Sequence, residues 1–120
     1  MSNCRKDVDF LADIEESADK ISRYVDCMTF DEFCDDSKTV DAVVRNLEII
    51  GEATKNISES FKSHTPEISW KGMAGLRDRL IHNYFGVDVE IVWTIAVDEV
   101  PVLLERLHKI NETTKENSTT

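Results

Sequence analysis

The stretch Gly75–Asp88 reads GLRDRLIHNYFGVD, and it carries a helical pattern together with the most unusual polar side chains of the chain. On an ideal helix of about 100° per residue, Arg77 lies between apolar neighbours on both sides, and Tyr84 falls about 20° from it. Arginine and tyrosine therefore occupy the middle of an apolar arc, where a core helix would carry leucines. Because a guanidinium is costly to bury alone, Arg77 is expected either to pair with an acid across the bundle or to line a cleft that receives an anion.

A histidine follows on another side of the same predicted helix. His82 lies about 140° from Arg77 and four residues after Asp78, whose carboxylate can accept from one imidazole nitrogen and leave the other free for proton transfer. Asn83 also flanks His82 and can help to orient it. Arg77 and His82 are too far around one helix to converge, but a two-fold dimer packed along this face would bring copies of both together. By itself, an Arg and a His at this spacing is also common as a satisfied polar pair.

Apolar residues recur at helical spacing through most of the chain, and no stretch alternates apolar and polar residues over the length of a strand. Helices are expected over residues 10–28, 30–33, 37–53, 69–84 and 89–110. Thr29 with Glu32 gives the second helix a capping-box signature. Ser69 and Asp88 are expected to cap the last two helices, and Pro101 to kink the last one.

The third predicted helix carries two apolar stripes, which suits the centre of a bundle. The stripes are Val40, Val43, Val44, Leu47 and Ile50 on one side and Ala42, Ile49 and Ala53 on another. The expected fold is therefore all-α, an up-down bundle of four main helices plus a short extra helix. Residues 58–67 are polar and are expected to form a loop. The predicted domain spans residues 1–110, and a polar, flexible tail spans residues 111–120.

Charge is the composition's main constraint on function. The chain has 120 residues with 24 acidic and 14 basic side chains, a net charge of −10. Such an acidic chain favours a basic protein partner, and a nucleic-acid function requires a local basic site.

No apolar run approaches the roughly 20 residues that span a bilayer, and no signal peptide is expected, so the predicted compartment is the cytoplasm. Three cysteines without C-x-x-C spacing are expected as free thiols, with no metal site and no cofactor.

Several segments together resemble the HEPN superfamily, in particular its minimal HepT-type toxins. The resemblance covers roughly residues 40–95. It is carried by RNLEIIGEATKNIS at Arg45–Ser58, PEISW at Pro66–Trp70, GLRDRLIHNYFGVD at Gly75–Asp88 and the pair Val92–Trp93. It implies an HEPN-like helical bundle, a symmetric homodimer and a metal-independent endoribonuclease whose composite active site lies at the dimer interface.

The resemblance also implies roles for particular residues. Arg77 would be the motif arginine that holds the phosphate, and His82 the motif histidine that transfers protons. A cognate nucleotidyltransferase antitoxin would transfer AMP to the motif tyrosine, Tyr84. The added negative charge would pair with Arg77 in place of RNA and switch the toxin off. The implied substrate is RNA, such as tRNA or mRNA.

Two further residues and two alternative functions remain open. Arg45 and Glu52, seven residues apart on one stripe, either border the cleft or pair within the bundle. Copies of Arg77, Arg79 and Arg45 in a dimer would offset part of the negative charge. The main alternative is a non-catalytic subunit that binds nucleotide or docks onto a nucleotidyltransferase. The second alternative is a dimer with a purely structural role, in which Arg77 pairs with a carboxylate such as Glu52.

Overall fold

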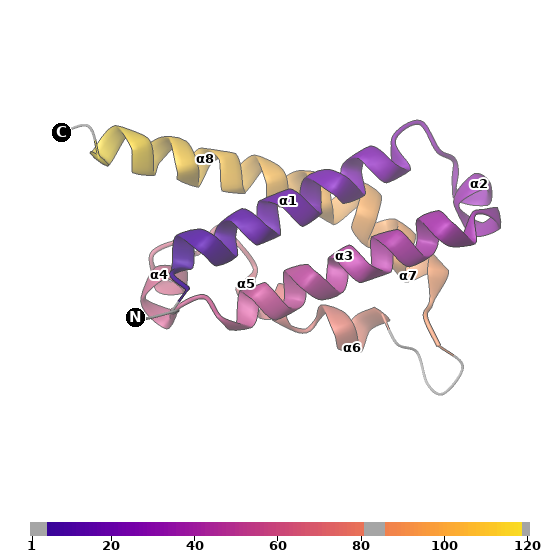
Figure 1. Cartoon of the computed structure of the whole chain (residues 1–120), viewed down its shortest axis with the longest axis horizontal. Helices are drawn as coiled ribbons and strands as arrows, with labels where there is room; N and C mark the ends of the chain where they lie inside the picture. The colour runs from indigo at the N-terminus through magenta and orange to yellow at the C-terminus, as the bar shows by residue number, and fades with distance from the viewer. Residues whose placement is uncertain (1–4, 81–85, 119–120) are drawn as a thin grey trace.

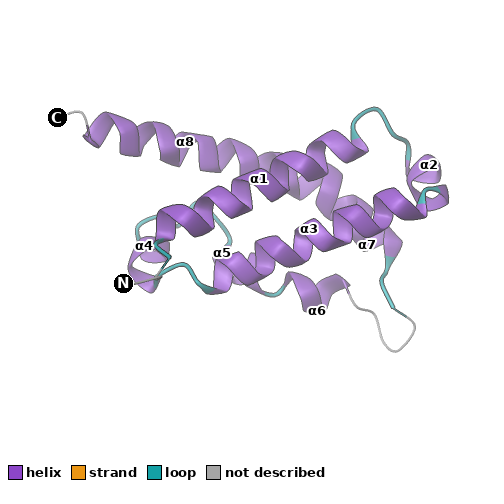
Figure 2. Ribbon diagram, in the orientation of Figure 1, coloured by secondary structure: helices purple, strands orange, loops and turns teal. Residues whose placement is uncertain are grey.

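The computed structural model describes residues 5–80 and 86–118, with residues 112–118 as backbone only. Four helical rods run alternately up and down (Figure 1). They are α1 (Asp7–Val25), α3 (Ser37–Lys55), α5 (Trp70–Ala74) with α6 (Leu76–Leu80), and α7 (Val89–Thr94) continued by the π-helical segment η2 (Ile95–Glu99) and α8 (Val100–Ser118). Two short helices, α2 (Phe30–Asp35) and α4 (Glu59–Ser63), lie in the connections. The described chain contains helices and loops without strands (Figure 2), which confirms the predicted all-α, up-down bundle.

Helix α3 occupies the centre of the bundle, as its two apolar stripes predict. It contacts α1, α2, α5, α6 and α7. From its first stripe Val40, Val43, Leu47 and Ile50 are buried, and from its second Ala53 is buried. Full burial of a Val, Leu or Ile side chain contributes about 1.5–3 kcal/mol. The central helix is therefore held on several faces, which makes it a rigid base for polar side chains on its remaining face.

The first helix ends earlier than its apolar pattern predicts. Cys27 has a φ of 63°, in the left-handed region that terminates helices, so Met28 lies beyond the helix instead of on its stripe. The predicted capping box of α2 is confirmed. Thr29 Oγ1 accepts from the Glu32 N–H at 3.1 Å, and the Glu32 carboxylate accepts from the Thr29 N–H at 2.8 Å.

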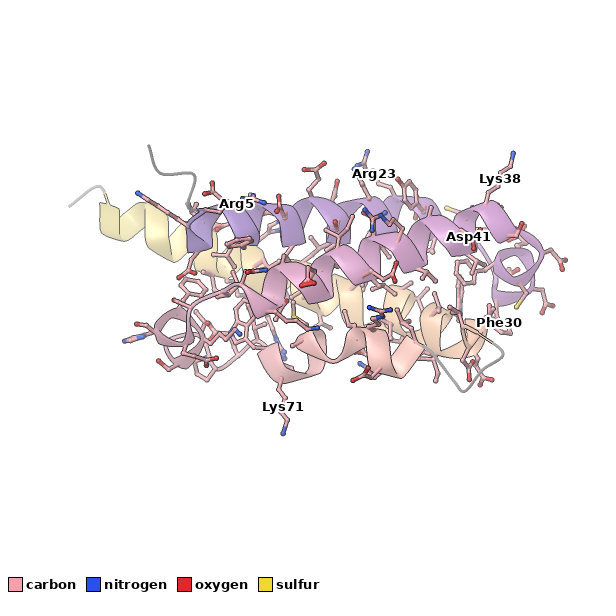
Figure 3. All side chains as sticks on the ribbon, turned by 60° about the horizontal axis from the view of Figure 1, so that its bottom comes forward. Arg5, Arg23, Phe30, Lys38, Asp41 and Lys71 are labelled. Carbon is pink, nitrogen blue, oxygen red and sulfur yellow. The ribbon has the colours of Figure 1, made fainter. Side chains whose placement is uncertain are left out.

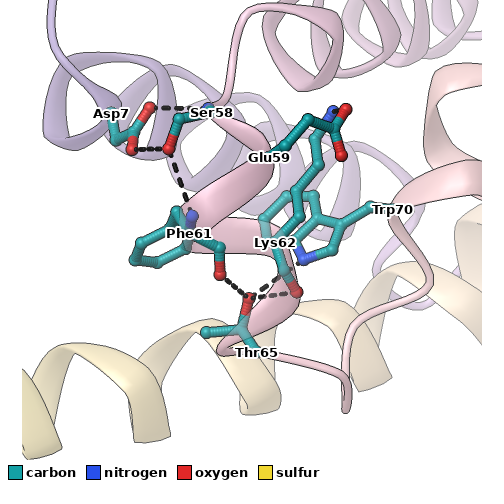
Figure 4. A network of polar contacts seen from close by, with 7 residues as sticks. All are labelled: Asp7, Ser58, Glu59, Phe61, Lys62, Thr65 and Trp70. Atoms are coloured by element: carbon teal, nitrogen blue, oxygen red, sulfur yellow. Dashed lines mark hydrogen bonds and ion pairs between the residues drawn. The ribbon is translucent and has the colours of Figure 1, made fainter.

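The segment expected as a loop, residues 58–67, contains helix α4, so that expectation is wrong. Ser58 Oγ caps α4 by accepting from the Phe61 N–H at 3.1 Å. The Asp7 carboxylate accepts from the Ser58 N–H at 2.9 Å and from its hydroxyl at 2.6 Å (Figure 4). A five-residue helix without an apolar stripe is visible in the sequence only through its cap. These bonds tie α4 to the start of α1.

Both tryptophans pack into the interior. Trp70 is buried and donates from Nε1 to Thr65 Oγ1 at 3.0 Å (Figure 4). Trp93 is half-buried, and its ring centroid lies 5.1 Å from that of Phe33 in α2. These contacts fix the short helices against the main rods.

The single helix expected over residues 69–84 is interrupted. Gly75 separates α5 from α6, and α6 is described only to Leu80, because residues 81–85 lie outside the described chain. Ser69 precedes α5 as predicted, but its side chain makes no capping hydrogen bond. The buried residues of the two short helices are Trp70, Met73, Leu76 and Leu80.

The last rod begins as predicted and continues further. The Asp88 carboxylate caps α7 by accepting from the N–H groups of Glu90 and Ile91. Pro101 has no N–H that could donate to the carbonyl four residues earlier in the helix. The wider turn of the π-helical segment η2 ends at Glu99, two residues before this proline. Helix α8 reaches Ser118, so the expected tail begins inside a helix. No described helix is long and apolar enough to cross a membrane.

Candidate functional site

A groove of about 400 Å³ lies between α1, α3 and the α5–α6 pair. It gathers four of the chain's 14 basic side chains, although the whole chain is strongly acidic. The basic residues are Arg5, Arg45, Lys55 and Arg77, and the acidic ones are Asp13, Glu48 and Glu52. Figure 3 shows other cations, including Arg23, Lys38 and Lys71, directed away from the bundle. This basic groove therefore carries a net charge of +1, from four basic and three acidic side chains, in a chain whose net charge is −10.

Arg77 lies at the rim of this groove and is exposed. The expectation that it is buried in an apolar arc is wrong, because Leu76 and Leu80 carry the buried face of α6. Within the described chain the Arg77 guanidinium forms no hydrogen bond and no ion pair. In particular, it is not paired with the Glu52 carboxylate. Its guanidinium is therefore available to an anion from solution.

Arg45 and Glu52 also line the groove, from the exposed face of α3. Neither side chain forms an ion pair with another described residue. The sequence left open whether Arg45 and Glu52 border a cleft or pair with each other inside the bundle. In the structure both residues line the groove. Asn46, next to Arg45, is instead buried, and its Nδ2 donates to the Ala42 carbonyl at 2.8 Å.

The groove depends on a close approach between α3 and α5. A Cβ on Gly51 would lie 3.2 Å from the Met73 carbonyl oxygen and 3.8 Å from Leu76 Cβ. Glycine in the middle of a helix costs about 0.5–1 kcal/mol relative to alanine. Here the missing side chain lets the start of α6 pack against α3, and Arg77 follows directly after this contact.

Arg79 does not join these cations, contrary to expectation. Its guanidinium makes two hydrogen bonds to the Glu99 carboxylate, at 3.0 and 2.8 Å. This contact raises the pKa of Arg79, and it lowers the pKa of Glu99 although burial opposes the effect. The pair joins α6 to η2, and so holds the short helix that carries Arg77.

Glu99→Gln is expected to reduce stability at neutral pH by about 0.5–1 kcal/mol, because both partners are nearly half exposed and such pairs contribute little. The carboxyl pKa is lower in the folded chain than its value of about 4.3 in the unfolded chain. The stabilisation is therefore complete above about pH 4.3 and is lost as the pH falls through the folded pKa. Urea unfolding at neutral pH and at about pH 3 measures the difference.

Glu105→Gln is the matched control for this pair. It removes a more exposed ion pair, with Lys109, from helix α8. An equal loss of stability for Glu99→Gln at both pH values would contradict the assigned role of the Arg79 contact.

Of the remaining predicted site residues, one lies in the part of the chain that the structure describes and three lie outside it. Asp78 is exposed on α6, directly after Arg77. His82, Asn83 and Tyr84 lie outside the described residues, so their roles stay predictions. No group of three His, Cys, Asp or Glu side chains suited to a metal occurs among the described residues.

Several groove residues were not predicted for the site, among them Lys55, Arg5 and Phe10. Lys55 lies ten residues after Arg45 and three after Glu52, so helical spacing alone would have placed it on the same face. Arg5 and Phe10 come from the start of the chain. The Arg5 guanidinium lies 4.8 Å from the Phe10 ring centroid, and only the tertiary fold brings that pair to α3.

The fold and the groove together define a small helical-bundle protein in which basic side chains gather in one groove of an otherwise acidic chain. A family model described as ribonuclease HepT-like matches residues 14–110. The chain belongs to this HepT-like family, as the resemblance indicated.

Curated relatives agree with this assignment. The chain is similar to a candidate RNase of Methanocaldococcus jannaschii, with 50% identity over 88% of each chain. It is 44% identical to a "Probable ribonuclease HepT" of Thermococcus cleftensis, over 90% of this chain and 98% of the relative. A candidate RNase of Caldanaerobacter subterraneus is 38% identical, over 84% of this chain and 90% of the relative. No solved structure matches the chain.

Proposed function

We propose that the chain is a metal-independent endoribonuclease toxin of a toxin–antitoxin pair. The observation that carries the proposal is Arg77, an exposed arginine without a partner in the described chain, set in the basic groove of a HepT-like protein. Membership of a family whose model is described as a ribonuclease favours RNA over other anions.

The proposed reaction uses the 2′-hydroxyl of the substrate as the nucleophile. That oxygen attacks the adjacent phosphorus, the bond to the 5′-oxygen breaks, and a cyclic phosphate remains on the upstream product. His82 accepts the proton from the 2′-hydroxyl, and the leaving 5′-oxygen takes a proton from solvent water. Arg77 holds the phosphate through a bidentate fork and stabilises the charge that develops there. Because the substrate supplies the nucleophile, this route requires no metal ion.

Dimerisation and regulation complete the proposal. A two-fold homodimer would place Arg77 and His82 copies in one cleft, as the resemblance to the HEPN superfamily implies. AMP transfer from an antitoxin to Tyr84 would put an anion beside Arg77 and exclude the RNA phosphate. Asp78 and Asn83 would orient His82.

Incubation of unmodified protein with a total tRNA pool in EDTA is expected to give fragments that end in a cyclic phosphate. Intact-mass spectrometry first establishes that the chain carries no AMP. A parallel reaction with added magnesium distinguishes the proposed route, which predicts equal cutting, from a metal-dependent one. Absence of cutting on both tRNA and mRNA would contradict the nuclease function and favour the alternative, a nucleotide-binding subunit of a nucleotidyltransferase complex.

A further inference from the structure

The part of the basic groove that α3 lines, from Arg45 to Lys55, has no role in the proposed chemistry. We propose that this part binds the single-stranded RNA that flanks the cleaved phosphate, with Arg45 and Lys55 contacting the backbone. The proposal rests on the proposed nuclease function, and it names the substrate class as single-stranded RNA held over several nucleotides.

The spacing of the two cations suits a strand. Arg45 and Lys55 are ten residues apart on α3, about 15 Å along the helix axis at ~1.5 Å per residue. At ~3.4 Å per nucleotide, that distance spans about four stacked nucleotides, and fewer if the strand is extended. Arg77 faces the same groove from α6. Three cations thus mark a path along which successive phosphates can lie.

These cations are available, which sets them apart from many others in the chain. In the described chain Arg23, Lys62 and Arg79 are paired with carboxylates. Arg45 and Lys55 are exposed and form no ion pair with a described residue. Cations that are not already neutralised contribute most to binding of phosphates, because they release condensed counterions when they bind.

An aromatic side chain lies at the α1 side of the groove. Phe10 is half-buried, and the Arg5 guanidinium covers its ring while donating to the Asp13 carboxylate at 2.7 Å. Sites for single-stranded nucleic acid combine a basic groove with aromatic or guanidinium surfaces on which bases stack. Phe10 with Arg5 supplies that second component.

Two carboxylates between the cations set the strength of binding. Glu48 and Glu52 line the groove and have no cationic partner in the described chain. Their charge repels phosphates and offsets much of the attraction from Arg45 and Lys55. The groove should therefore hold RNA loosely, and neutralising Glu52 should strengthen binding.

The test measures binding of a fluorescent RNA of about 12 nucleotides, within the range of such sites, made with 2′-O-methyl groups so that it cannot be cleaved. Anisotropy titrations from about 50 to 200 mM salt give the affinity and its salt dependence. Lys55→Gln and Arg45→Gln are each expected to weaken binding several-fold and to reduce the slope of log K against log salt by about 0.7. Glu52→Gln is expected to tighten binding, an effect that misfolding cannot produce.

Lys38→Gln is the matched control, because Lys38 is exposed on the same helix but lies outside the groove. Affinities of Lys55→Gln and Arg45→Gln equal to that of this control would overturn the proposal, even where wild-type protein cleaves ordinary RNA. Equal binding of a duplex of the same sequence would overturn the single-stranded assignment. Groove-dependent binding without cleavage of ordinary RNA would instead sustain the groove and contradict the nuclease function.

Discussion

Cleavage of RNA by the His82→Ala variant is expected to fall by about 10²–10⁴-fold, the usual contribution of general acid–base catalysis. Imidazole is the side chain whose ordinary pKa, about 6.5, lies closest to working pH. In the proposed reaction, loss of His82 leaves the 2′-hydroxyl without a proton acceptor, whereas the proposed contact between Arg77 and the phosphate remains. RNA binding should therefore change much less than the cleavage rate.

Single-turnover cleavage of a defined RNA in EDTA measures the rate, and anisotropy with a non-cleavable RNA measures the binding. His108→Ala is the matched control, because His108 is exposed and its Nε2 lies 3.3 Å from a Glu15 carboxylate oxygen, outside the groove. A wild-type rate for His82→Ala, or an equal loss for His108→Ala, would remove His82 from the mechanism. The wild-type rate should also change with pH through the ionisation of an essential group, and the variant should lose that dependence.

The long elements of the fold could be predicted from the sequence because burial imposes a period on apolar residues. The two stripes of α3 correctly placed it at the centre, and side-chain chemistry correctly located the caps at Thr29 and Asp88. Short-range irregularities were missed. Helix α4 has too few residues for a period, and the apolar pattern on both sides of Gly75 gives no sign of the interruption there.

The candidate site was predictable in part for a related reason. Arg45 and Glu52 share a face of α3 by spacing alone, and the resemblance to the HEPN superfamily supplied Arg77. Arg79 does not line the groove, because it pairs with Glu99, which is 20 residues distant along the chain. No local sequence pattern predicts this contact. The position of Arg77 relative to the apolar face was misjudged, because the buried residues Met73, Leu76 and Leu80 lie on one side of it, whereas Ala74 on its other side is only half-buried.

Arg77→Ala is expected to lower the cleavage rate by about 10²–10³-fold, the usual effect of removing one group that stabilises the transition state. Arg77→Lys should recover only part of this, because an ammonium cannot form the planar two-point contact of a guanidinium with phosphate. Unlike His82→Ala, both variants should also weaken RNA binding. Single-turnover kinetics and anisotropy separate the two effects, and Arg23→Ala, at an exposed site outside the groove, is the matched control.

Mixing the Arg77→Ala and His82→Ala proteins tests whether the site is shared between two subunits. If Arg77 of one subunit acts with His82 of the other, each mixed dimer contains one intact site. Random exchange between two-fold dimers would then restore about a quarter of the wild-type rate. If both residues act within one subunit, every site lacks one of them and the mixture stays inactive. Recovery would therefore place the reaction across the dimer interface, and continued inactivity after confirmed exchange would contradict a composite site.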